Sequence, residues 1–360
     1  MEPIRLEVQS ERAYPVLIGP GLLAALPQRL ADEALDRQVV VVSVPPVWRA
    51  HGRALRPVLG GQPVTLLQDG ERAKTLTSVQ RIYDTLVRQR VDRSGTVVAF
   101  GGGVVGDVAG FAAATYLRGI NVVQVPTTLL AQVDSAIGGK VGVNLPAGKN
   151  LVGAFHPPAL VVCDPDVLGT LARREFRAGL YEVVKYGVIA SPSLLDRLGA
   201  NLDAVFARRR ELLTPLIAEC CRIKADVVGR DERESGPRRA LNFGHTVGHA
   251  LEAVTRYRRF RHGEAVAYAM LAAVRVSAER GLVGRDDEAR FRDLILRLGP
   301  LPPVTDLSIT DALEAITHDK KVVGRTLHFV LADGLGATTT ATDVRPGELR
   351  AAMRRLGMRG

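Results

Sequence analysis

Thr96-Val97-Val98-Ala99-Phe100-Gly101-Gly102-Gly103-Val104-Val105-Gly106-Asp107 is the stretch of sequence that decides the fold. Its first half is the β-branched run of a buried strand, and a helical pattern follows over 108–117. Between them, Gly101, Gly103 and Gly106 satisfy G-x-G-x-x-G in the right setting, after a strand and before a helix. Such glycines let backbone N–H groups approach a pyrophosphate, so the stretch predicts a dinucleotide-binding turn, with a purely structural turn as the alternative.

Short apolar runs of the same kind lie on both sides of this stretch. They cover residues 39–43, 64–68, 122–126 and 160–163. Helical patterns such as 76–88 lie between them. This alternation of strands and helices is typical of βαβ units and predicts a mostly parallel sheet. The turn follows a middle strand and no acidic residue closes the next one, so an ordinary Rossmann arrangement is in doubt; Asp69 or Glu71, from the preceding strand end, is the candidate partner of a ribose hydroxyl.

Two further segments combine glycine with cationic or amide side chains. Gly138-Gly139-Lys140 and Gly148-Lys149-Asn150 are predicted to be loops with a mobile backbone, suited to binding phosphate. The alternative is that they are ordinary surface loops. The G-x-x-x-x-G-K-[ST] pattern is absent, which argues against an ATPase.

The predicted secondary structure changes after Asp164-Pro165-Asp166, where strand patterns are followed by helical ones. The predicted helices cover 176–189, 193–207, 211–228, 241–254, 264–280, 287–298 and 348–356, with a small hairpin over 326–331 and 337–341. We therefore expect two domains, an α/β domain over 1–172 and a helical domain over 173–360.

The second half carries a cluster of histidines in Leu241-Asn242-Phe243-Gly244-His245-Thr246-Val247-Gly248-His249-Ala250-Leu251-Glu252. His245, His249 and Glu252 are spaced to share one face of a helix, and His262 follows after a short basic loop. Imidazole is the commonest metal ligand, and zinc takes three protein ligands when one position stays open for substrate. Thr246 replaces the glutamate of an H-E-x-x-H protease, and satisfied structural histidines are the alternative.

A carboxylate in an apolar helix extends this cluster. Glu182 and Lys185 lie one turn apart in the helix predicted over 176–189, where a buried carboxylate needs a partner or a metal. An ion pair between the two is one interpretation. In the other, Glu182 completes a Glu/His/His set, the ligand set of an open catalytic zinc site.

Charge and composition narrow the class of protein. The chain has 48 Lys and Arg against 38 Asp and Glu, a net charge of +10 that favours anionic substrates. Aromatic residues make up only 5%, which argues against a base-stacking nucleic-acid surface. The adjacent pair Cys220 and Cys221, with Cys163, forms no disulfide framework, and neither a signal-like apolar core nor a long apolar run is found. We expect a cytoplasmic protein without membrane contact.

Taken together, these motifs resemble the 3-dehydroquinate synthase family over nearly the whole chain. The matching segments are 101–107, 126–128, 133–135, 138–140, 148–150, 179–187, 241–250, 262–264 and Asp319-Lys320-Lys321. The resemblance implies an N-terminal NAD-binding domain and a helical C-terminal domain, with the active site in the cleft between them, in a homodimer. It implies a lyase of the shikimate pathway that converts 3-deoxy-D-arabino-heptulosonate 7-phosphate into 3-dehydroquinate and phosphate. That reaction proceeds by transient oxidation with NAD, phosphate β-elimination, reduction and aldol closure.

The resemblance also assigns roles to residues of this chain. It implies that Glu182, His245 and His262 bind Zn²⁺ or Co²⁺. Catalytic roles fall on Glu234, His249, Lys185 and Asp134, of which Glu234 and His249 match the proton-transfer positions. The implied substrate-binding residues are Arg118 from the partner subunit, Asp134, Lys140, Asn150, Lys185, Lys224, Arg238, Asn242, His249 and one of Lys320 and Lys321. The implied NAD contacts are Asp69, Gly70, Glu71, Lys74, Gly102, Gly103, Val104, Val105, Gly106, Asp107, Thr127, Thr128, Lys140, Lys149, Val167, Leu168, Gly169 and Thr170.

Some positions depart from the family pattern, and other functions stay open. Tyr181 stands where alanine is common before the glutamate ligand, Val44 stands where many members carry an asparagine near the adenosine ribose, and the region of Gly169 is looser than usual. The alternatives are a polyol dehydrogenase of related architecture, a cyclase acting on another sugar phosphate, and a basic nucleic-acid-binding module. The pair Lys224 and Arg238, with Asn242, favours a substrate that bears a carboxylate.

Overall fold

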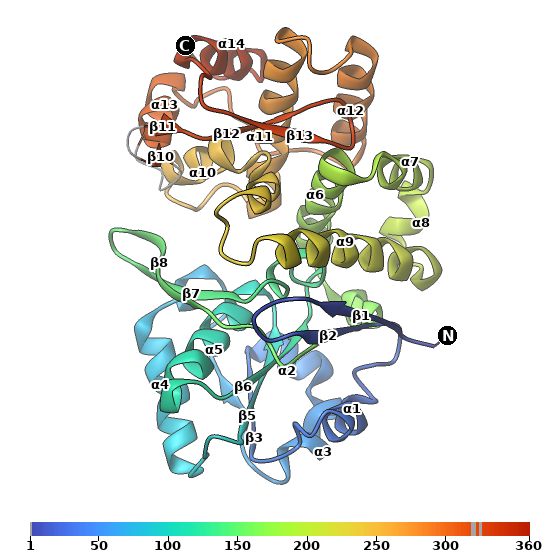
Figure 1. Cartoon of the computed structure of the whole chain (residues 1–360), viewed down its shortest axis with the longest axis vertical. Coiled ribbons are helices and arrows are strands. Elements are labelled where there is room, and N and C mark those ends of the chain that lie inside the picture. The colour runs from blue at the N-terminus through green and yellow to red at the C-terminus, as the bar shows by residue number, and fades with distance from the viewer. Residues whose placement is uncertain (1, 318–321, 324–325) are drawn as a thin grey trace. The chain divides into compact units, whose positions relative to one another are not determined.

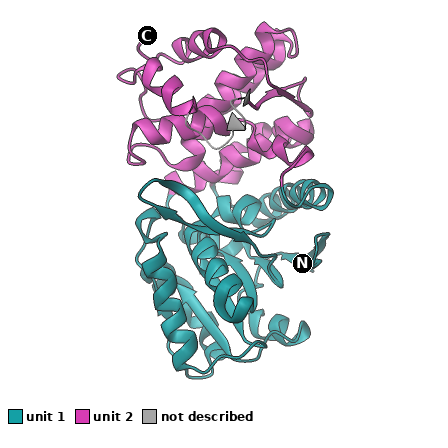
Figure 2. Cartoon of the chain, turned by 60° about the vertical axis from the view of Figure 1, so that its left-hand side comes forward, with its two compact units in different colours: residues 1–172, 207–233 teal, residues 173–206, 234–360 magenta. Residues whose placement is uncertain are grey.

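The computed structural model describes residues 2–317, 322–323 and 326–360. The chain forms two compact units, coloured separately in Figure 2. Unit 1 contains residues 1–172 and 207–233, and unit 2 contains 173–206 and 234–360. The first break coincides with the predicted domain boundary, but the later segment 207–233 belongs to unit 1 and not to the helical half.

Unit 1 is built on a seven-stranded sheet in the order β1-β2-β9-β6-β5-β3-β4. Figure 1 labels β1, β2, β6, β5 and β3 of this sheet. The strands are β1 (Ile4–Val8), β2 (Tyr14–Ile18), β3 (Val39–Ser43), β4 (Thr65–Leu66), β5 (Thr96–Gly101), β6 (Asn121–Pro126) and β9 (Leu160–Cys163). Neighbouring strands are parallel except for the edge pair β1 and β2. The predicted parallel sheet is confirmed, while β1 and β2 are additions that the sequence did not indicate.

Both faces of this sheet are covered, which explains why its strands are apolar throughout. Alternate residues point to opposite faces: Val40, Val97 and Val122 join one core cluster, and Val41, Val98 and Val123 join the other. Helices α4 (Leu76–Arg88) and α5 (Gly103–Thr115) cover the first face. The second is covered by α1 (Leu26–Asp32), η1 (Gly52–Leu55) and α3 (Arg56–Leu59). A short helix, α2 (Pro45–His51), follows β3.

The strand order reverses between β3 and β5. From β3 the chain moves to β4 on one side, and the later strands add on the other side. Ligands of open α/β sheets bind beyond the carboxyl ends of the strands at such a switch point. The glycine turn that follows β5 therefore stands where a binding site is expected.

A hairpin replaces the two predicted phosphate-binding loops. β7 (Lys140–Leu145) and β8 (Gly148–Phe155) pair antiparallel, so Lys140, Lys149 and Asn150 lie on strands, and the prediction of mobile loops is wrong. Glycine is required in β7 because the backbones of the two strands approach closely. A Cβ on Gly142 would lie 2.6 Å from the carbonyl oxygen of Val152.

Unit 1 is completed by the long helix α9 and several short turns. α9 (Arg210–Arg230) contacts β1, β2 and the π-helical turn η4 (Ala131–Ser135). The remaining turns of the unit are η2 (Glu71–Ala73), η3 (Tyr116–Arg118) and η5 (Pro165–Thr170). A helix pattern alone does not show which unit the helix packs against, so the place of α9 in unit 1 was not predicted.

Unit 2 is mainly helical. Its helices are α6 (Arg173–Ala190), α7 (Pro192–Ala200), α8 (Leu202–Phe206), α10 (His245–Val254), α11 (His262–Glu279), α12 (Arg285–Arg297), α13 (Ile309–Thr317) and α14 (Pro346–Arg355), with the turn η6 (Pro237–Asn242). Two short hairpins join them, β10 (Val322–Val323) with β11 (Thr326–Leu327), and β12 (Phe329–Ala332) with β13 (Thr338–Ala341). α10 packs against α11, and α11 packs against α6, which brings three helices to one point.

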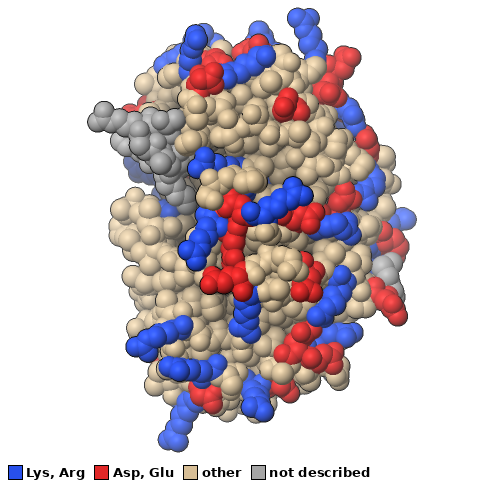
Figure 3. Space-filling model, viewed as in Figure 1, with Lys and Arg blue, Asp and Glu red and all other residues tan. Residues whose placement is uncertain are grey.

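Three further features are the surface charge, the state of the cysteines and the character of the helices. On the face drawn in Figure 3, basic and acidic side chains are interspersed. All three cysteines are buried, and none of them forms a disulfide with another described residue. Within the described residues, no helix combines the length and the apolar character that crossing a membrane requires.

Candidate active site

The glycine turn after β5 is shaped by packing as well as by access to backbone. A Cβ on Gly101 would lie 2.5 Å from Cγ2 of Val105, and one on Gly103 would lie 2.9 Å from Oγ of Ser135. Gly102 precedes the first turn of α5, where no side chain caps the helix. The N–H groups of that turn, among them those of Val104 and Val105, are the donors that a helix start offers to a phosphate.

Two hydroxyls beside the turn fit a polar ligand. The side-chain oxygens of Thr127, just after β6, and Ser135, in η4, are buried and have no hydrogen-bond partner among the described residues. Buried hydroxyls are normally satisfied, so these two are available to hydrogen-bond a bound polar group. Thr128 is used differently, because its Oγ1 accepts from the backbone N–H of Ala131 at 3.2 Å. This arrangement fits a dinucleotide, and Ser135 is a residue to which the sequence assigned no role.

An ion pair joins α5 to the residue that follows η2. Lys74 and Asp107 are hydrogen-bonded through their side chains, and the Lys74 side chain is only 7% exposed. Burial raises the pKa of Asp107, and the charge and hydrogen bond of Lys74 counteract that rise. A Cβ on Gly106, one residue earlier, would lie 2.7 Å from Oε1 of Gln124, so helix and sheet approach closely here.

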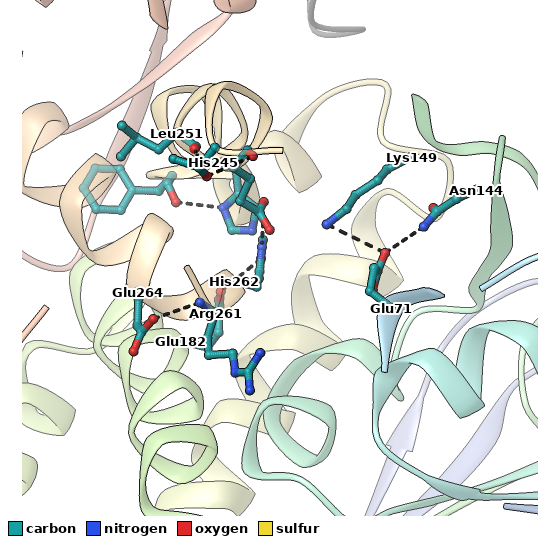
Figure 4. Close-up of polar contacts among 12 residues, drawn as sticks. Glu71, Asn144, Lys149, Glu182, His245, Leu251, Arg261, His262 and Glu264 are labelled. Atoms are coloured by element: carbon teal, nitrogen blue, oxygen red, sulfur yellow. Dashed lines mark hydrogen bonds and ion pairs between the residues drawn. The ribbon is translucent and has the colours of Figure 1, made fainter. Parts of the chain in front are cut away.

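Glu71 connects the segment after β4 to the hairpin. Its Oε1 accepts a hydrogen bond from Nδ2 of Asn144 at 2.8 Å and lies 3.7 Å from Nζ of Lys149 (Figure 4). Asn144 in turn accepts from the backbone N–H of Asn150 at 3.0 Å, and Asn150 has a φ of +54°. These contacts bring the predicted NAD residue Lys149 and the predicted phosphate residue Asn150 to the end of the hairpin that faces Glu71.

The other predicted cofactor residues lie on two short segments. Asp69 and Gly70 are exposed at the end of β4, and Gly70 has a φ of +89°. In η5, Val167 and Leu168 bury their side chains in unit 1, so only their backbone is open to a ligand. Thr170 contacts Nε2 of His51 at 2.7 Å. A Cβ on Gly169 would meet nothing within 4 Å, so this position does not require glycine.

In unit 2, Glu182, His245 and His262 converge, although they lie on three different helices. Their candidate ligand atoms all lie within 4.8 Å of one another, and the rings of His245 and His262 are 5.2 Å apart, centre to centre (Figure 4). Glu182 is fully buried, and neither carboxylate oxygen has a well-aligned hydrogen-bond donor among the described residues. Lys185 Nζ lies 2.6 Å from Oε2 as an ion pair. A buried carboxylate with two nearby imidazoles fits a divalent metal ion such as Zn²⁺.

Glycines let the three helices approach this point. A Cβ on Gly263 would lie 1.9 Å from the carbonyl oxygen of Ala178, so the start of α11 rests directly on the backbone of α6. Gly244, just before α10, has a φ of +76° and would clash with the Met270 side chain if it carried a Cβ. Because no other residue fits either position without strain, these glycines fix where His245 and His262 begin their helices.

A buried carboxylate ties α11 to α6. Glu264 is fully buried and is held by Arg174, whose Nε and one terminal nitrogen each donate at 2.7 Å. Arg177 lies 3.5 Å away, and the backbone N–H of Arg261 donates to Glu264 at 2.8 Å. Burial alone would raise the pKa of Glu264, but these hydrogen bonds and charges hold that pKa below its usual value. The clamp joins the helix of Glu182 to the helix of His262.

Two family models cover the chain consecutively, the 3-dehydroquinate synthase N-terminal model over residues 64–178 and the C-terminal model over residues 179–322. The chain belongs to the 3-dehydroquinate synthase family. The 3-dehydroquinate synthase of Nostoc punctiforme is 48% identical over 341 residues, which is 93% of this chain and 94% of that protein. The one from Halorhodospira halophila is also 48% identical, over 94% of this chain and 95% of that protein.

Solved structures of similar fold are consistent with this family assignment. A 2-epi-5-epi-valiolone synthase from Streptomyces hygroscopicus subsp. jinggangensis, with NAD⁺ and Zn²⁺ bound, is 30% identical with a TM-score of 0.86, over 98% of this chain and 99% of that one. A 2-deoxy-scyllo-inosose synthase complexed with carbaglucose-6-phosphate, NAD⁺ and Co²⁺ is 27% identical with a TM-score of 0.87, over the same shares. A glycerol dehydrogenase from Schizosaccharomyces pombe, 15% identical with a TM-score of 0.69 over 99% of this chain and 90% of that one, shares the fold.

The substrate residues that the 3-dehydroquinate synthase resemblance implies are divided between the units. In unit 1, Lys224 on α9 forms an ion pair with Asp134 on η4 and donates to its backbone oxygen at 2.6 Å. Lys140 begins β7 and is exposed. Arg118 is exposed at η3, where it and Leu117 both have positive φ values, +69° and +51°.

In unit 2, the remaining implied residues lie on η6, α6 and α10. Asn242 donates from Nδ2 to Glu234 Oε1, and Glu234 has a φ of +61°. Arg238 is buried, with 2% exposure, and the ring of His249 lies 6.1 Å from that of His262. Lys320 and Lys321 lie outside the described residues.

Two of the three departures from the family pattern, Tyr181 and Val44, are buried, whereas Gly169 is exposed. Tyr181 is fully enclosed next to Glu182, and burial raises the pKa of its hydroxyl. Val44 packs into the core cluster under α4 and α5, so it contributes an apolar contact where many members of the family carry an amide.

Proposed function

We propose that this chain is an NAD- and metal-dependent lyase that converts 3-deoxy-D-arabino-heptulosonate 7-phosphate into 3-dehydroquinate and phosphate in the shikimate pathway. The convergence of Glu182, His245 and His262 is the observation that carries the proposal. Identities of 48% to 3-dehydroquinate synthases, against 30% to a valiolone synthase, favour this substrate over those of other cyclases.

The cofactors have separate places in the chain. All the residues proposed to contact NAD belong to unit 1, and all three proposed metal ligands belong to unit 2. When bound, NAD⁺ supplies a reversible hydride acceptor and the divalent ion supplies the charge that polarises the hydroxyl to be oxidised. The donors of the α5 start and the hydroxyls of Thr127 and Ser135 are suited to hold the dinucleotide.

The chain's own side chains supply charge and proton transfer for the substrate. Lys224 and Arg238 are proposed to face the carboxylate, and Lys140, Asn150, Asn242 and His249 the phosphate. A substrate with two anionic groups needs several such donors. The hydrogen bond from Asn242 to Glu234 orients a carboxylate that we propose to move protons together with His249. Lys185 and Asp134, each already in an ion pair, are proposed to orient substrate hydroxyls.

The reaction itself is the direct test. Purified protein given the heptulosonate phosphate should release inorganic phosphate in a manner that needs NAD⁺ and is abolished by a chelator, and no NADH should accumulate. Sustained NADH formation from a polyol would contradict the proposal and point to a dehydrogenase of the same fold. Phosphate release only from another sugar phosphate would point to a different cyclase.

We propose in addition that the enzyme is a cytoplasmic homodimer in which Arg118 serves the partner's site. The strained and exposed turn with Leu117 and Arg118 is the feature that supports this role. Dimers of Arg118→Ala should be inactive, as should dimers of His262→Ala. Subunit exchange between them should restore about one quarter of wild-type activity, because half of the dimers are mixed and each mixed dimer has one intact site. No recovery despite exchange would place Arg118 in its own subunit's site, and active Arg118→Ala dimers would show that it serves neither site.

A further inference from the structure

His262 lies between two buried glutamates. Its Nε2 is 3.6 Å from Oε1 of Glu182, and its Nδ1 is 3.4 Å from Oε2 of Glu252. Glu252 belongs to α10, two turns after His245, and it is only 5% exposed. The mechanism proposed above uses Glu182 but gives Glu252 no task. A carboxylate this deeply buried beside an imidazole calls for an explanation.

The proton of the imidazole provides that explanation. A neutral imidazole carries one N–H, and the nitrogen that bears it cannot bind a metal. An ionised Glu252 accepts hydrogen bonds only, so it draws the proton to Nδ1 and leaves the lone pair of Nε2 on the side of Glu182. His245 is arranged in the same way, because its Nδ1 lies 3.1 Å from the backbone oxygen of Phe243.

We propose that Glu252 is the positioning residue for His262: it fixes the ring's tautomer and orientation so that Nε2 is the ligand atom. This inference rests on the proposed metal role of His262. Carboxylate partners of this kind raise the basicity of a ligating imidazole, which a neutral backbone carbonyl does to a smaller degree. Glu252 therefore strengthens His262 as a proposed metal ligand through the contact at its Nδ1.

A second cation site is the competing interpretation. His249, Glu252 and His262 also offer ligand atoms within 4.8 Å of one another. A metal held there would need the lone pair of Nδ1 of His262, and the ring proton would then move to Nε2 and face Glu182. The two groups therefore compete for one ring, and the fully buried Glu182, with two poorly satisfied oxygens, favours the first.

The test compares Glu252→Gln with Glu279→Gln in the full-length protein. Glu279 lies at the far end of α11, where its side chain is 36% exposed and paired with Arg275, so it controls for the loss of one charge. We expect Glu252→Gln to weaken Co²⁺ binding by about 10–100-fold. Glu279→Gln should bind Co²⁺ as the wild type does, and both variants should bind NAD normally. Co²⁺ affinity is measured by competition with a chelator, and the ligand field of the bound ion by its visible spectrum.

Glu252→Asp keeps the charge and should recover part of the affinity that Glu252→Gln loses. Unchanged Co²⁺ affinity and spectrum in Glu252→Gln would overturn the proposal. So would a second, inhibitory Co²⁺ equivalent in the wild type that Glu252→Gln removes, because Glu252 would then itself be a ligand. A failure of the proposed metal site would give a different result. If His262→Ala binds Co²⁺ as well as the wild type does, the assignment of His262 as a ligand is wrong, whatever the result for Glu252→Gln.

Discussion

The candidate sites of the two units consist of different chemical groups. In unit 1 the site is mainly backbone, made available by glycines at the end of β5 and flanked by two hydroxyls. In unit 2 it is made of ionisable side chains from α6, α10 and α11, enclosed among further charged groups. The first kind of site is damaged by adding atoms and the second by removing charge, so different substitutions should affect each.

Removing a proposed metal ligand gives the largest expected effect. His262→Ala should lose the bound metal and lower turnover by roughly 10³-fold, because a three-ligand centre loses one ligand and its polarising charge. NAD affinity should not change, since no predicted NAD contact lies in unit 2. Metal content by elemental analysis, turnover by phosphate release and NAD affinity by calorimetry check this. Full metal stoichiometry with full activity would refute the ligand assignment.

Glu264 and its arginine partners allow a test of stability rather than of activity. Glu264→Gln should destabilise the chain by about 1.5–3 kcal/mol, because Arg174, whose side chain is 45% exposed, and the more buried Arg177 lose a charged hydrogen-bond partner. The matched control is Asp306→Asn, which breaks a similar two-bond pair with Arg259, but at a position where Asp306 is 59% exposed. That control should lower the denaturant midpoint far less, because water screens an exposed pair. Equal denaturant midpoints for the two variants would show that burial does not distinguish these pairs.

A single added methyl group tests the backbone-built site. Gly103→Ala should weaken NAD binding about tenfold, since its Cβ would press against Ser135 beside the helix start that receives the phosphates. Gly169→Ala, at a predicted cofactor contact with open space around it, should change NAD affinity little. Both variants should retain their metal. Equal NAD affinities in the two would indicate that the turn does not need its glycine for binding.

The smallest effect concerns acid stability in unit 2. Two nitrogens of Arg280 bind Glu348 at 2.7 and 2.9 Å and hold its pKa at about 2, below the usual value of 4.5. Because the folded pKa is lowered, the pair stabilises the fold above pH 4.5, and that contribution is lost as the pH falls toward 2. The pair is partly exposed, so the difference should be about 1 kcal/mol or less.

Glu348→Gln should therefore destabilise the protein at pH 7 and make no difference near pH 2, as measured by thermal melting at a series of pH values. The control Glu314→Gln, at an exposed position on α13, should melt like the wild type throughout. A Glu348→Gln penalty that is the same at both pH values would contradict the pKa shift as its cause.

Sequence reasoning was accurate where a local pattern carries the information. Helix α4 has the predicted bounds, with Thr75 as the cap that accepts from Ser78, and β3 matches its predicted range. The sequence also grouped Glu182, His245 and His262, whose candidate ligand atoms lie within 4.8 Å of one another, while their role as metal ligands stays a prediction. Local pattern and motif were enough for these parts of the fold and of the site.

Features that depend on distant partners were missed. The glycines of β7 and β8 were interpreted as signs of mobility, whereas they allow two strands to approach closely, which no single segment reveals. Glu252 was seen to share a face with the histidines, but its relation to His262 depends on how α10 packs on α11. Ser135 stood inside a recognised motif, and only the packing against Gly103 shows that its hydroxyl is left without a partner.

The return of segment 207–233 to unit 1 has a consequence for biosynthesis. When residue 172 leaves the ribosome, every strand of the large sheet has been made, but α9, which contacts β1, β2 and η4, has not. Unit 1 can therefore reach its final state only after α6, α7 and α8 of the other unit have been synthesised. A fragment cut at residue 172 would expose the surface that α9 covers, so the nascent chain must complete its two halves in an interleaved order.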